Sequence, residues 1–232
     1  MIEKLKIAPQ YRYERKFVLT GISHAEVLHR IKTHPAFFRE IFHSRQINNI
    51  YLDTDKLQFF KDNQIGIADR KKVRVRWYGE TFGKVENPKL EYKIKAGLVG
   101  DKNTFNLVGF NLSKHLNISQ FSDYLQQCNL PEPVAVDLQM LSPTLLNCYQ
   151  RTYFQTPDKK FRLTVDEDLT YYRVNKPETY FQAKHIEKGS IIIELKYAPG
   201  NDLEAGRIMN LMPFRLDKSS KYVNGVEFFE RK

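Results

Sequence analysis

Residues 70–79 read Arg-Lys-Lys-Val-Arg-Val-Arg-Trp-Tyr-Gly, a stretch that alternates between charged and apolar side chains. The even-numbered positions from 70 to 76 are all basic, and Val73, Val75 and Trp77 lie between or beside them. Successive side chains of a β-strand point to opposite faces, so the pattern predicts a strand with one basic face and one apolar face. Such a strand fits an antiparallel sheet with only one apolar face.

Other runs with period-two alternation extend this interpretation. The expected strands are residues 11–19, 49–53, 71–79, 89–95, 148–155, 160–166 and 190–197, with a weaker candidate at 171–174. Helices are expected in the connections: one follows the capping box of Ser23 and Glu26, a second opens at Pro35 and runs through Phe42, and residues 119–128 and 203–211 have helical spacing. Strands dominate, so the sequence predicts an α+β fold with a largely antiparallel sheet or barrel.

Length and composition are consistent with one domain over residues 1–232. Hydrophobic residues make up 41% of the 232 residues, and no repeat or Pro/Gly/Ser-rich linker divides the chain. The net charge of +10 favours polyanionic partners such as nucleic acid, acidic lipid or phosphate-rich small molecules. The sequence contains no long apolar run that would predict a signal peptide or a membrane span. Cys128 and Cys148 lack metal-ligand spacing and are expected as reduced thiols of a cytoplasmic protein.

The charged face recurs on strand after strand. It carries Arg12, Glu14 and Lys16, then Arg70, Lys72, Arg74 and Arg76, then Glu91, Lys93 and Lys95, then Arg162, Thr164 and Asp166, then Glu194 and Lys196. A solvated outer face would explain any one strand, but neighbouring cations repel each other unless an anion lies between them. A sheet closed with this face inward would form a basic cavity suited to phosphate groups. Its carboxylates could hold Mg²⁺ or Mn²⁺ shared with those phosphates.

Eight short motifs follow one another in an order that resembles a known family. They are residues 14–17 (Glu-Arg-Lys-Phe), 50–54 (Ile-Tyr-Leu-Asp-Thr), 73–79 (Val-Arg-Val-Arg-Trp-Tyr-Gly), 90–93 (Leu-Glu-Tyr-Lys), 149–154 (Tyr-Gln-Arg-Thr-Tyr-Phe), 162–166, 193–197 (Ile-Glu-Leu-Lys-Tyr) and 220–222 (Ser-Lys-Tyr). The ordered set resembles the polymerase (VTC) domain of the vacuolar transporter chaperone complex, in the CYTH-like triphosphate tunnel metalloenzyme superfamily.

The resemblance implies a predominantly antiparallel eight-stranded β-barrel with helices in the connections, and it assigns roles to residues. The implied phosphate-binding residues are Lys16, Arg74, Arg76, Lys93, Lys102, Arg151, Arg162, Lys196 and Lys221. Of these, Arg74, Arg76, Lys93 and Arg151 would be catalytic. Glu194 resembles the metal-binding glutamate of the family, and Glu14 and Glu91 would assist it in holding Mn²⁺ or Mg²⁺.

Two departures from the family pattern bear on the reaction. Related hydrolases and cyclases carry Glu-x-Glu-x-Lys on the first strand, whereas this chain has Arg12-x-Glu14-x-Lys16. The missing acid argues against a second metal site and favours the polymerase branch. The fungal proteins also have an SPX sensor domain and membrane helices in their complex, which this sequence lacks. The resemblance therefore implies a protein that is peripheral at the inner face of a membrane and docks to a separate membrane protein.

The leading hypothesis is a metal-dependent phosphotransferase that moves the γ-phosphate of ATP onto inorganic polyphosphate. The alternatives are an inorganic tripolyphosphatase with a metal-activated water and a non-catalytic polyphosphate-binding module. Nucleic-acid binding is less favoured, because the sequence shows no zinc-finger spacing, RNP motif or basic helix. No P-loop motif is present, so any nucleotide would be held in another way. The pairs Asp53/Asp55 and Asp166/Asp168 are expected to cap turns at strand ends, although they could also be metal ligands.

Overall fold

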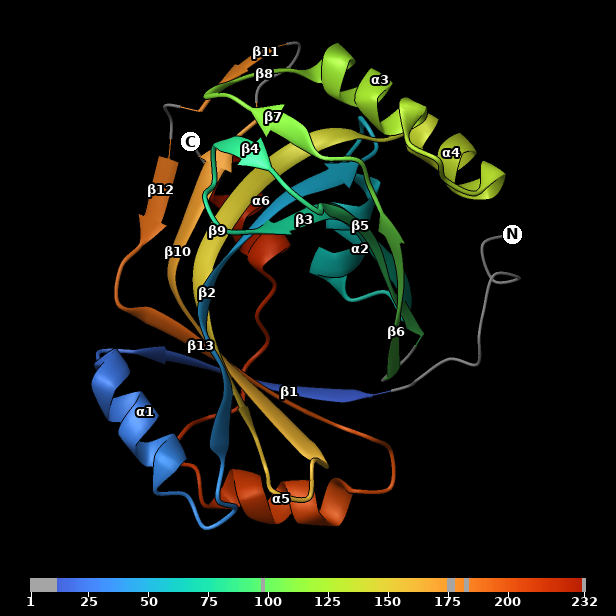
Figure 1. Cartoon of the computed structure of the whole chain (residues 1–232). Coiled ribbons are helices and arrows are strands. Elements are labelled where there is room, and N and C mark those ends of the chain that lie inside the picture. Colours follow the sequence, from blue (N-terminus) through green and yellow to red (C-terminus); the bar gives the residue numbers. More distant parts are fainter. Residues whose placement is uncertain (1–11, 97–98, 175–177, 182–183, 231–232) are drawn as a thin grey trace.

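A curved antiparallel sheet forms the centre of the computed structural model, which describes residues 12–96, 99–174, 178–181 and 184–230. The path across the sheet is β1 (Tyr13–Thr20), β13 (Ser190–Tyr197), β10 (Phe161–Arg173), β9 (Ser142–Gln155), β2 (Arg39–Asp53), β3 (Asp69–Tyr78), β5 (Lys89–Ala96) and β6 (Val99–Asn106). A ninth strand, β12 (Lys184–Glu187), pairs with β10. Figure 1 shows how this sheet bends around a central space.

The predicted α+β fold with an eight-stranded antiparallel path is confirmed, but the barrel is not closed by backbone hydrogen bonds. The two ends of the path, β1 and β6, do not pair with each other in the described residues. An ion pair bridges this side of the sheet instead, because Lys93 Nζ on β5 lies 2.8 Å from a carboxylate oxygen of Glu14 on β1. A charged contact therefore lies where a closed barrel would have a strand ladder.

Two short two-stranded sheets and six helices complete the described part of the chain. The pairs are β4 (Gly83–Val85) with β7 (Phe110–Leu112) and β8 (His115–Asn117) with β11 (Glu178–Tyr180). The helices are α1 (His24–Lys32), α2 (Gln58–Ile65), α3 (Ile118–Gln127), α4 (Glu132–Gln139), α5 (Asp202–Asn210) and α6 (Lys221–Glu230). Among these helices, none combines the length and the apolar character that a membrane span requires.

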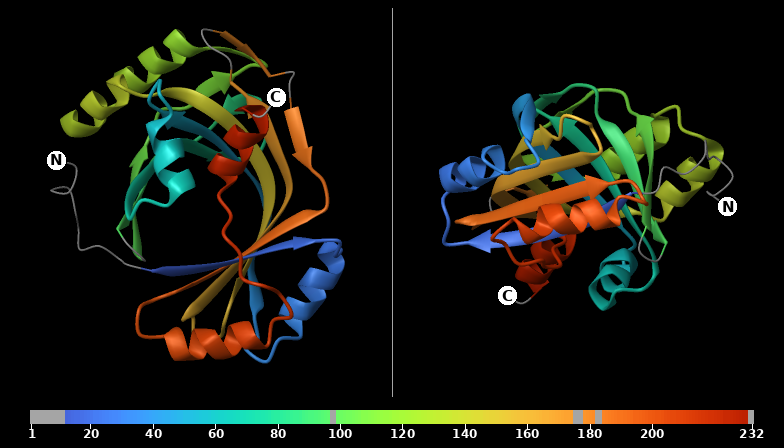
Figure 2. Two further views of the ribbon diagram at one scale, coloured as in Figure 1. Left: turned by 180° about the vertical axis from the view of Figure 1, so that it is seen from behind. Right: turned by 90° about the horizontal axis from the view of Figure 1, so that it is seen from below.

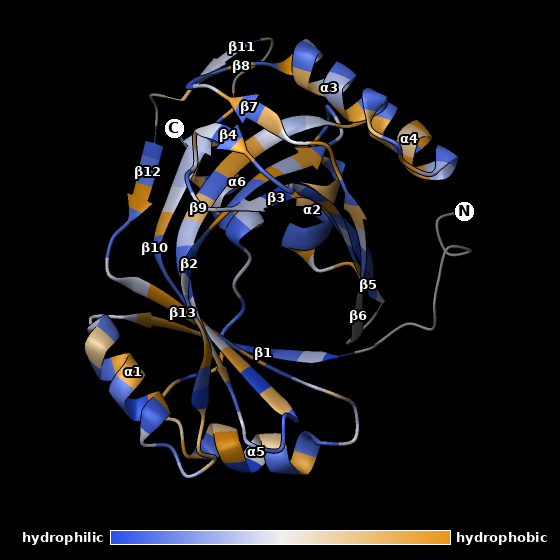
Figure 3. Ribbon diagram, viewed as in Figure 1, coloured by the Kyte–Doolittle hydropathy of each residue, from blue (hydrophilic) through white to orange (hydrophobic). Residues whose placement is uncertain are grey.

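Helices cover the apolar face of the sheet on its outer side. Val73, Val75 and Trp77 of β3 are buried in one cluster with Phe121 of α3 and Val134 of α4. A second cluster joins β1, β10 and β13 to α1 and α5. Figure 3 shows that α1, α3 and α5 each carry an apolar and a polar side, as expected for helices packed on a sheet. The charged face of the strands is therefore left on the inner side.

Helices α2 and α6 pack in one cluster with residues of the sheet. Figure 2 shows both of them in front of the sheet when the molecule is seen from behind. Tyr222 of α6 stacks on Tyr51 of β2 with ring centroids 4.8 Å apart, and its hydroxyl donates to Asp53 at 2.6 Å. Asp53 also accepts from the backbone N–H groups of Phe59 and Phe60, which begin α2. Asp53 therefore caps the first turn of α2, whereas the sequence interpretation expected it to cap a turn at the end of its strand.

The predicted helix from Pro35 through Phe42 is wrong. Strand β2 begins at Arg39, and its pairing with β9 already includes Arg39 opposite Gln155 and Glu40 opposite Phe154. Phe37 takes a left-handed backbone conformation with φ 53°, which stops any helix there, and Phe38 turns into the core. Pairing with a long neighbouring strand overrides the local helix signal.

Several other elements agree with expectation but differ in extent. Ser23 caps α1 by accepting from the N–H of Glu26 at 3.2 Å. The separate strands predicted at 160–166 and 171–174 are one strand, β10, with an irregularity in its pairing between Glu167 and Thr170. Asp168, at this irregularity, has φ 54°. A bulge of this kind shifts the side-chain alternation, which is why the pattern suggested two strands.

Candidate active site

The inner face of the sheet encloses a cavity of about 490 Å³ that is lined mainly by basic side chains. All nine residues predicted to bind phosphate line it: Lys16, Arg74, Arg76, Lys93, Lys102, Arg151, Arg162, Lys196 and Lys221. Arg12, Lys72 and Lys95 add further basic groups. The cavity thus brings together cations from strands that are far apart in the sequence, as the repeated charged faces predicted.

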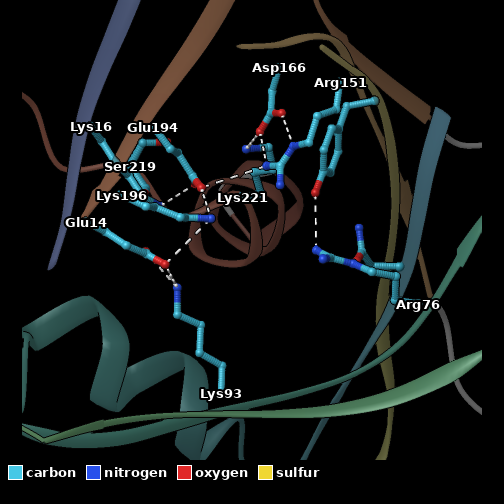
Figure 4. Close-up of polar contacts among 12 residues, drawn as sticks. Glu14, Lys16, Arg76, Lys93, Arg151, Asp166, Glu194, Lys196, Ser219 and Lys221 are labelled. Carbon is cyan, nitrogen blue, oxygen red and sulfur yellow. Dashed lines mark hydrogen bonds and ion pairs between the residues drawn. The ribbon is translucent and has the colours of Figure 1, made fainter. Parts of the chain in front are cut away.

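Glu14 and Glu194 lie among the lysines on one side of the cavity (Figure 4). The Glu194 carboxylate lies 3.1 Å from Lys16 Nζ and 2.9 Å from Lys196 Nζ. Lys196 Nζ is also 3.8 Å from Glu14. The register of β1 and β13 explains this arrangement, because Glu14 lies opposite Lys196 and Lys16 lies opposite Glu194. Each carboxylate therefore has a lysine beside it on the neighbouring strand.

The lysines change the acidity of both carboxylates. Burial raises the pKa of Glu14, but Lys93 and Lys196 outweigh it and lower the pKa to about 2. The pKa of Glu194 is also lowered, because Lys16 and Lys196 outweigh the effect of its burial. Both groups are therefore ionised at neutral pH.

For Lys93 the effect of burial on the pKa is larger than that of the neighbouring carboxylate. Burial lowers the pKa of Lys93, and the negative charge of Glu14 opposes this effect. Repulsion from Lys16 and Lys196 lowers the pKa further, and the result is a pKa of about 8. A second negative charge in the cavity would favour the charged form of Lys93.

Glu91 forms a second cluster and does not join Glu14 and Glu194. Its carboxylate lies 2.6 Å from Arg74 Nη2, 3.5 Å from Arg76 Nη1 and 2.8 Å from Lys102 Nζ. These cations outweigh the effect of burial and lower the pKa of Glu91. Glu91 therefore belongs to a different ion-pair cluster from Glu14 and Glu194, and its assistance to Glu194 stays a prediction.

Asp166 was placed on the charged face by the sequence interpretation but was not given a role among the predicted site residues. The turn-capping role expected for it is wrong, because Asp166 lies within β10 and is fully buried. Its carboxylate accepts from Arg151 Nη2 at 2.6 Å and from Lys221 Nζ at 2.6 Å. The period-two pattern of β10 already placed Asp166 on the charged face with Arg162, so this signal was available. Asp166 orients two cations of the cavity wall.

Four tyrosines also line the cavity, Tyr51, Tyr78, Tyr149 and Tyr153, and nothing in the charge pattern identified them. Tyr149 accepts a hydrogen bond from Arg76 Nη2 at 3.3 Å, and the ring lies under Lys221 Nζ at 4.7 Å from the centroid. Burial raises the pKa of Tyr149, but the Arg151 and Arg76 cations outweigh it and lower the pKa. Tyr51 accepts from Arg74 Nη1 at 3.4 Å. Both hydroxyls therefore help to fix the arginines that the sequence did identify.

The carboxylate pair Glu14 and Glu194 fits a hard divalent cation. Within the described part of the chain, no three His, Cys, Asp or Glu side chains form a group that could hold a metal by themselves. Mg²⁺ is usually bound by one or two carboxylates together with substrate phosphates and water, so the donor set of Glu14 and Glu194 matches this pattern. Lys196, which lies between them, would have to move or pair with a phosphate oxygen when a metal binds.

Solved structures with the same fold define the class of protein. The chain aligns with a protein from Pyrococcus horikoshii at TM-score 0.52 and 12% identity, over 96% of this chain and 100% of that one. A proposed adenylyl cyclase from Hippeastrum with a dominant triphosphatase activity aligns at TM-score 0.54 and 11% identity, over 94% and 95%. A proposed adenylate cyclase from Bacillus halodurans aligns at TM-score 0.52 and 14% identity, over 92% and 96%. The fold is that of the CYTH-like triphosphate tunnel proteins.

The family follows from the sequence itself. The VTC domain family model matches residues 11–230, which is nearly the whole chain. The chain therefore belongs to the VTC domain family, and the resemblance drawn from its motifs is confirmed. A search of curated proteins found no match. The family model and the solved structures thus agree, the first on the VTC domain and the second on the fold.

Proposed function

We propose that this protein is a phosphotransferase that moves the γ-phosphate of ATP onto the end of an inorganic polyphosphate chain. The observation that carries the proposal is the cavity of a VTC domain lined by nine predicted cations from seven strands and α6. In the reaction, the bond between the γ-phosphorus and the oxygen that bridges to the β-phosphate breaks. A terminal oxygen of the polyphosphate forms the new bond, and ADP leaves.

The cavity wall provides what phosphoryl transfer needs most, which is alignment and charge neutralisation. Glu91 holds Arg74 and Arg76, and Asp166 holds Arg151, so these guanidinium groups are fixed before a substrate arrives. Donors fixed in advance stabilise developing charge without rearrangement. Arg74, Arg76 and Arg151 would bind the oxygens of the transferred phosphoryl group, and Arg162 would bind phosphates nearer the solvent.

The lysines would hold the rest of the phosphate chain. Lys16, Lys93 and Lys196 surround the two carboxylates, and Lys221 and Lys102 lie at the other carboxylate clusters. Enzymes of the tunnel class generally use a divalent metal ion. Glu194 and Glu14 would hold Mn²⁺ or Mg²⁺ here, and the metal would neutralise charge on the phosphate oxygens.

A tripolyphosphatase is the second candidate function. The Hippeastrum structure is described as having a dominant triphosphatase activity, and water would replace the polyphosphate end as acceptor. Arg12 weighs against this reaction in the present chain, because it lines the cavity at the position where related hydrolases carry a glutamate. A non-catalytic module that only binds polyphosphate is the third candidate.

The experiment is an incubation of the pure protein with ATP and Mn²⁺, analysed on a gel stained for polyphosphate. We expect a ladder of products that is lost in the double variant Arg74→Ala/Arg76→Ala. The matched control, Arg30→Ala/Arg207→Ala, removes two arginines from helices outside the cavity and should keep the ladder. Phosphate release without a ladder would favour the hydrolase, and neither product from a folded protein would favour the binding module.

Cytoplasmic location and docking to a separate membrane protein belong to the same proposal. Both rest on the family resemblance. Membrane docking would be tested by fractionation of cells that express the tagged protein, with and without a salt wash of the membranes.

A further inference from the structure

Lys72, a partly buried cation of the tunnel, differs from the other cations there in its partners. It lies on β3 opposite Lys93 on β5, and its side chain lines the cavity. Its Nζ donates to Ser220 Oγ at 2.7 Å. Lys93, opposite it on β5, and Arg74, two residues along its own strand, are each paired with a glutamate. Among the described residues, Lys72 has no ion pair with a carboxylate.

The groups that face Lys72 are almost all positive. Lys16 faces it from β1, Lys93 from β5, and Arg74 and Arg70 from its own strand. The segment before α6 contributes the neutral hydroxyl of Ser220. An ammonium in these surroundings loses hydration, and the cations nearest to it repel it. Burial, followed by repulsion from Lys16 and Lys93, accordingly lowers the pKa of Lys72 well below the usual value of lysine.

We propose that Lys72 is a further phosphate-binding residue, which is a neutral amine in the empty tunnel and takes up one proton when a polyphosphate chain binds. The inference rests on the proposed function, since it requires a phosphate chain in the tunnel. The step is a simple protonation: the amine nitrogen accepts a proton from solvent, and the resulting ammonium pairs with a phosphate oxygen. No other bond changes.

A Lys72 that stays neutral until a ligand binds reduces the charge repulsion in the empty protein. A charged Lys72 would add one more cation to a site that already holds Lys16, Lys93 and Arg74 close together. An anionic chain reverses the sign of the local potential, so it supplies the stabilisation that the ammonium lacks. Ser220 also accepts from the N–H of Val223 in the first turn of α6, at 3.3 Å. Ser220 thus links Lys72 to the start of α6, so the change in charge of Lys72 would take place beside that helix.

The test is titration calorimetry of the full chain with inorganic tripolyphosphate, without metal, in buffers of different ionisation enthalpy at neutral pH. We expect Lys72→Met to take up about one proton fewer on binding than the wild type. The control is Lys102→Met, which removes a tunnel lysine that is already paired with Glu91. It should bind more weakly than the wild type with unchanged proton uptake.

The outcomes separate this inference from the proposed function. Binding with equal proton uptake in wild type and Lys72→Met would overturn the role of Lys72 and leave the tunnel proposal intact. No binding of tripolyphosphate by the wild type would overturn both.

A second measurement does not depend on a ligand or on the folding of a variant. The ¹³C shift of lysine Cε reports the charge of the amine, and a pH titration of the empty protein should show Lys72 neutral at neutral pH. A Lys72 signal that titrates like an exposed lysine would overturn the inference.

Discussion

At the scale of single residues, buried carboxylates hold the cations of the tunnel in position. Asp166 is fully buried and accepts from both Arg151 and Lys221. Removal of one partner from a buried ion pair leaves an uncompensated charge, which typically destabilises a protein by about 3–5 kcal/mol. The same carboxylate must also compete with phosphate for these two cations.

Asp166→Asn is therefore predicted to destabilise the empty protein by about 3 kcal/mol, because Arg151 and Lys221 lose their counterion. Saturating tripolyphosphate should restore part of the loss, since it supplies negative charge to the same cations. Urea unfolding with and without ligand measures both effects. Asp158→Asn, in an exposed turn, is the control and should change little. An Asp166→Asn protein as stable as the wild type would contradict the counterion role.

Glu194→Gln is predicted to separate phosphate binding from metal-dependent turnover. Glu194 competes with phosphate for Lys16 and Lys196, so its neutralisation should strengthen metal-free tripolyphosphate binding about tenfold, equivalent to one charge-assisted hydrogen bond. Activity with Mn²⁺ should be lost, because a proposed metal ligand is gone. Calorimetry and the product gel provide the two readouts. Weaker binding together with full activity would contradict the assignment.

The pKa of about 8 for Lys93 predicts opposite effects of pH on stability and on ligand binding. An unfolded lysine titrates near 10.5, so between these values the unfolded chain binds more protons and the stability of the empty protein rises with pH. Tripolyphosphate affinity should instead fall as pH rises through 8, because Lys93 loses its charge. Binding measured from about pH 7 to pH 9 checks this, with Lys93→Met as the comparison. An equal slope in the variant would show that Lys93 is not responsible.

Much of the site could be predicted at this scale, because the alternation of charged and apolar residues along a strand can be seen in the sequence. All nine expected cations line the cavity, as do Glu14 and Glu194. The partner of each charge could not be predicted, since it depends on strand order and register. Glu91 was grouped with Glu194 in the sequence interpretation, yet β5 places it beside Arg74 and Lys102. Tyr149 was missed because an apolar-looking ring carries no charge signal.

At the scale of elements, helix α6 depends on one glycine for its packing. A Cβ at Gly225 would lie 2.5 Å from Leu145 Cδ2 and 2.6 Å from Tyr171 Cδ1, so the helix approaches β9 and β10 too closely for any side chain. Tyr222 and Lys221, at the start of the same helix, contact Asp53 and Asp166. The position of α6 therefore influences the end of the tunnel.

Gly225→Ala is predicted to destabilise the protein and to weaken tripolyphosphate binding, because α6 must shift and carries Lys221 with it. Overpacking of a core usually costs about 1–3 kcal/mol. Gly206→Ala is the matched control: it lies in α5 with nothing within 4 Å of the added Cβ, and it should stabilise by about 0.5–1 kcal/mol. Thermal melts and calorimetry of both variants test the prediction. A Gly225→Ala protein that behaves like Gly206→Ala would contradict it.

The helices and strands that could be predicted are those whose apolar residues recur at a regular spacing in the sequence. Strands β1, β3, β5 and β13 and helices α1, α3 and α5 agree with expectation within a few residues. Helices α2, α4 and α6 were not predicted. In α6 the signal was available, because the buried residues Tyr222, Val226 and Phe229 follow helical spacing. The start of β2 was assigned to a helix, since the reason for its extension is pairing with β9, a strand about a hundred residues away in the chain.

At the scale of the whole molecule, the net charge of +10 is concentrated in part around one cavity. Cations held together repel each other, and a polyanion that binds only the folded state stabilises it. Tripolyphosphate at about 100 times its Kd should therefore stabilise the protein by about 2.7 kcal/mol. Added salt should reduce the effect by screening. An unchanged melting temperature at saturating tripolyphosphate would contradict a phosphate-binding tunnel.

The most direct test of the central claim follows the γ-phosphate itself. ATP labelled with ³²P at the γ position would be incubated with the protein, Mn²⁺ and a short polyphosphate primer, and the label would be separated by chain length. We predict that the label enters polyphosphate chains longer than the primer and that this transfer is lost in Arg74→Ala/Arg76→Ala. Label found only in free phosphate, or left in ATP by a correctly folded protein, would contradict the phosphotransferase account.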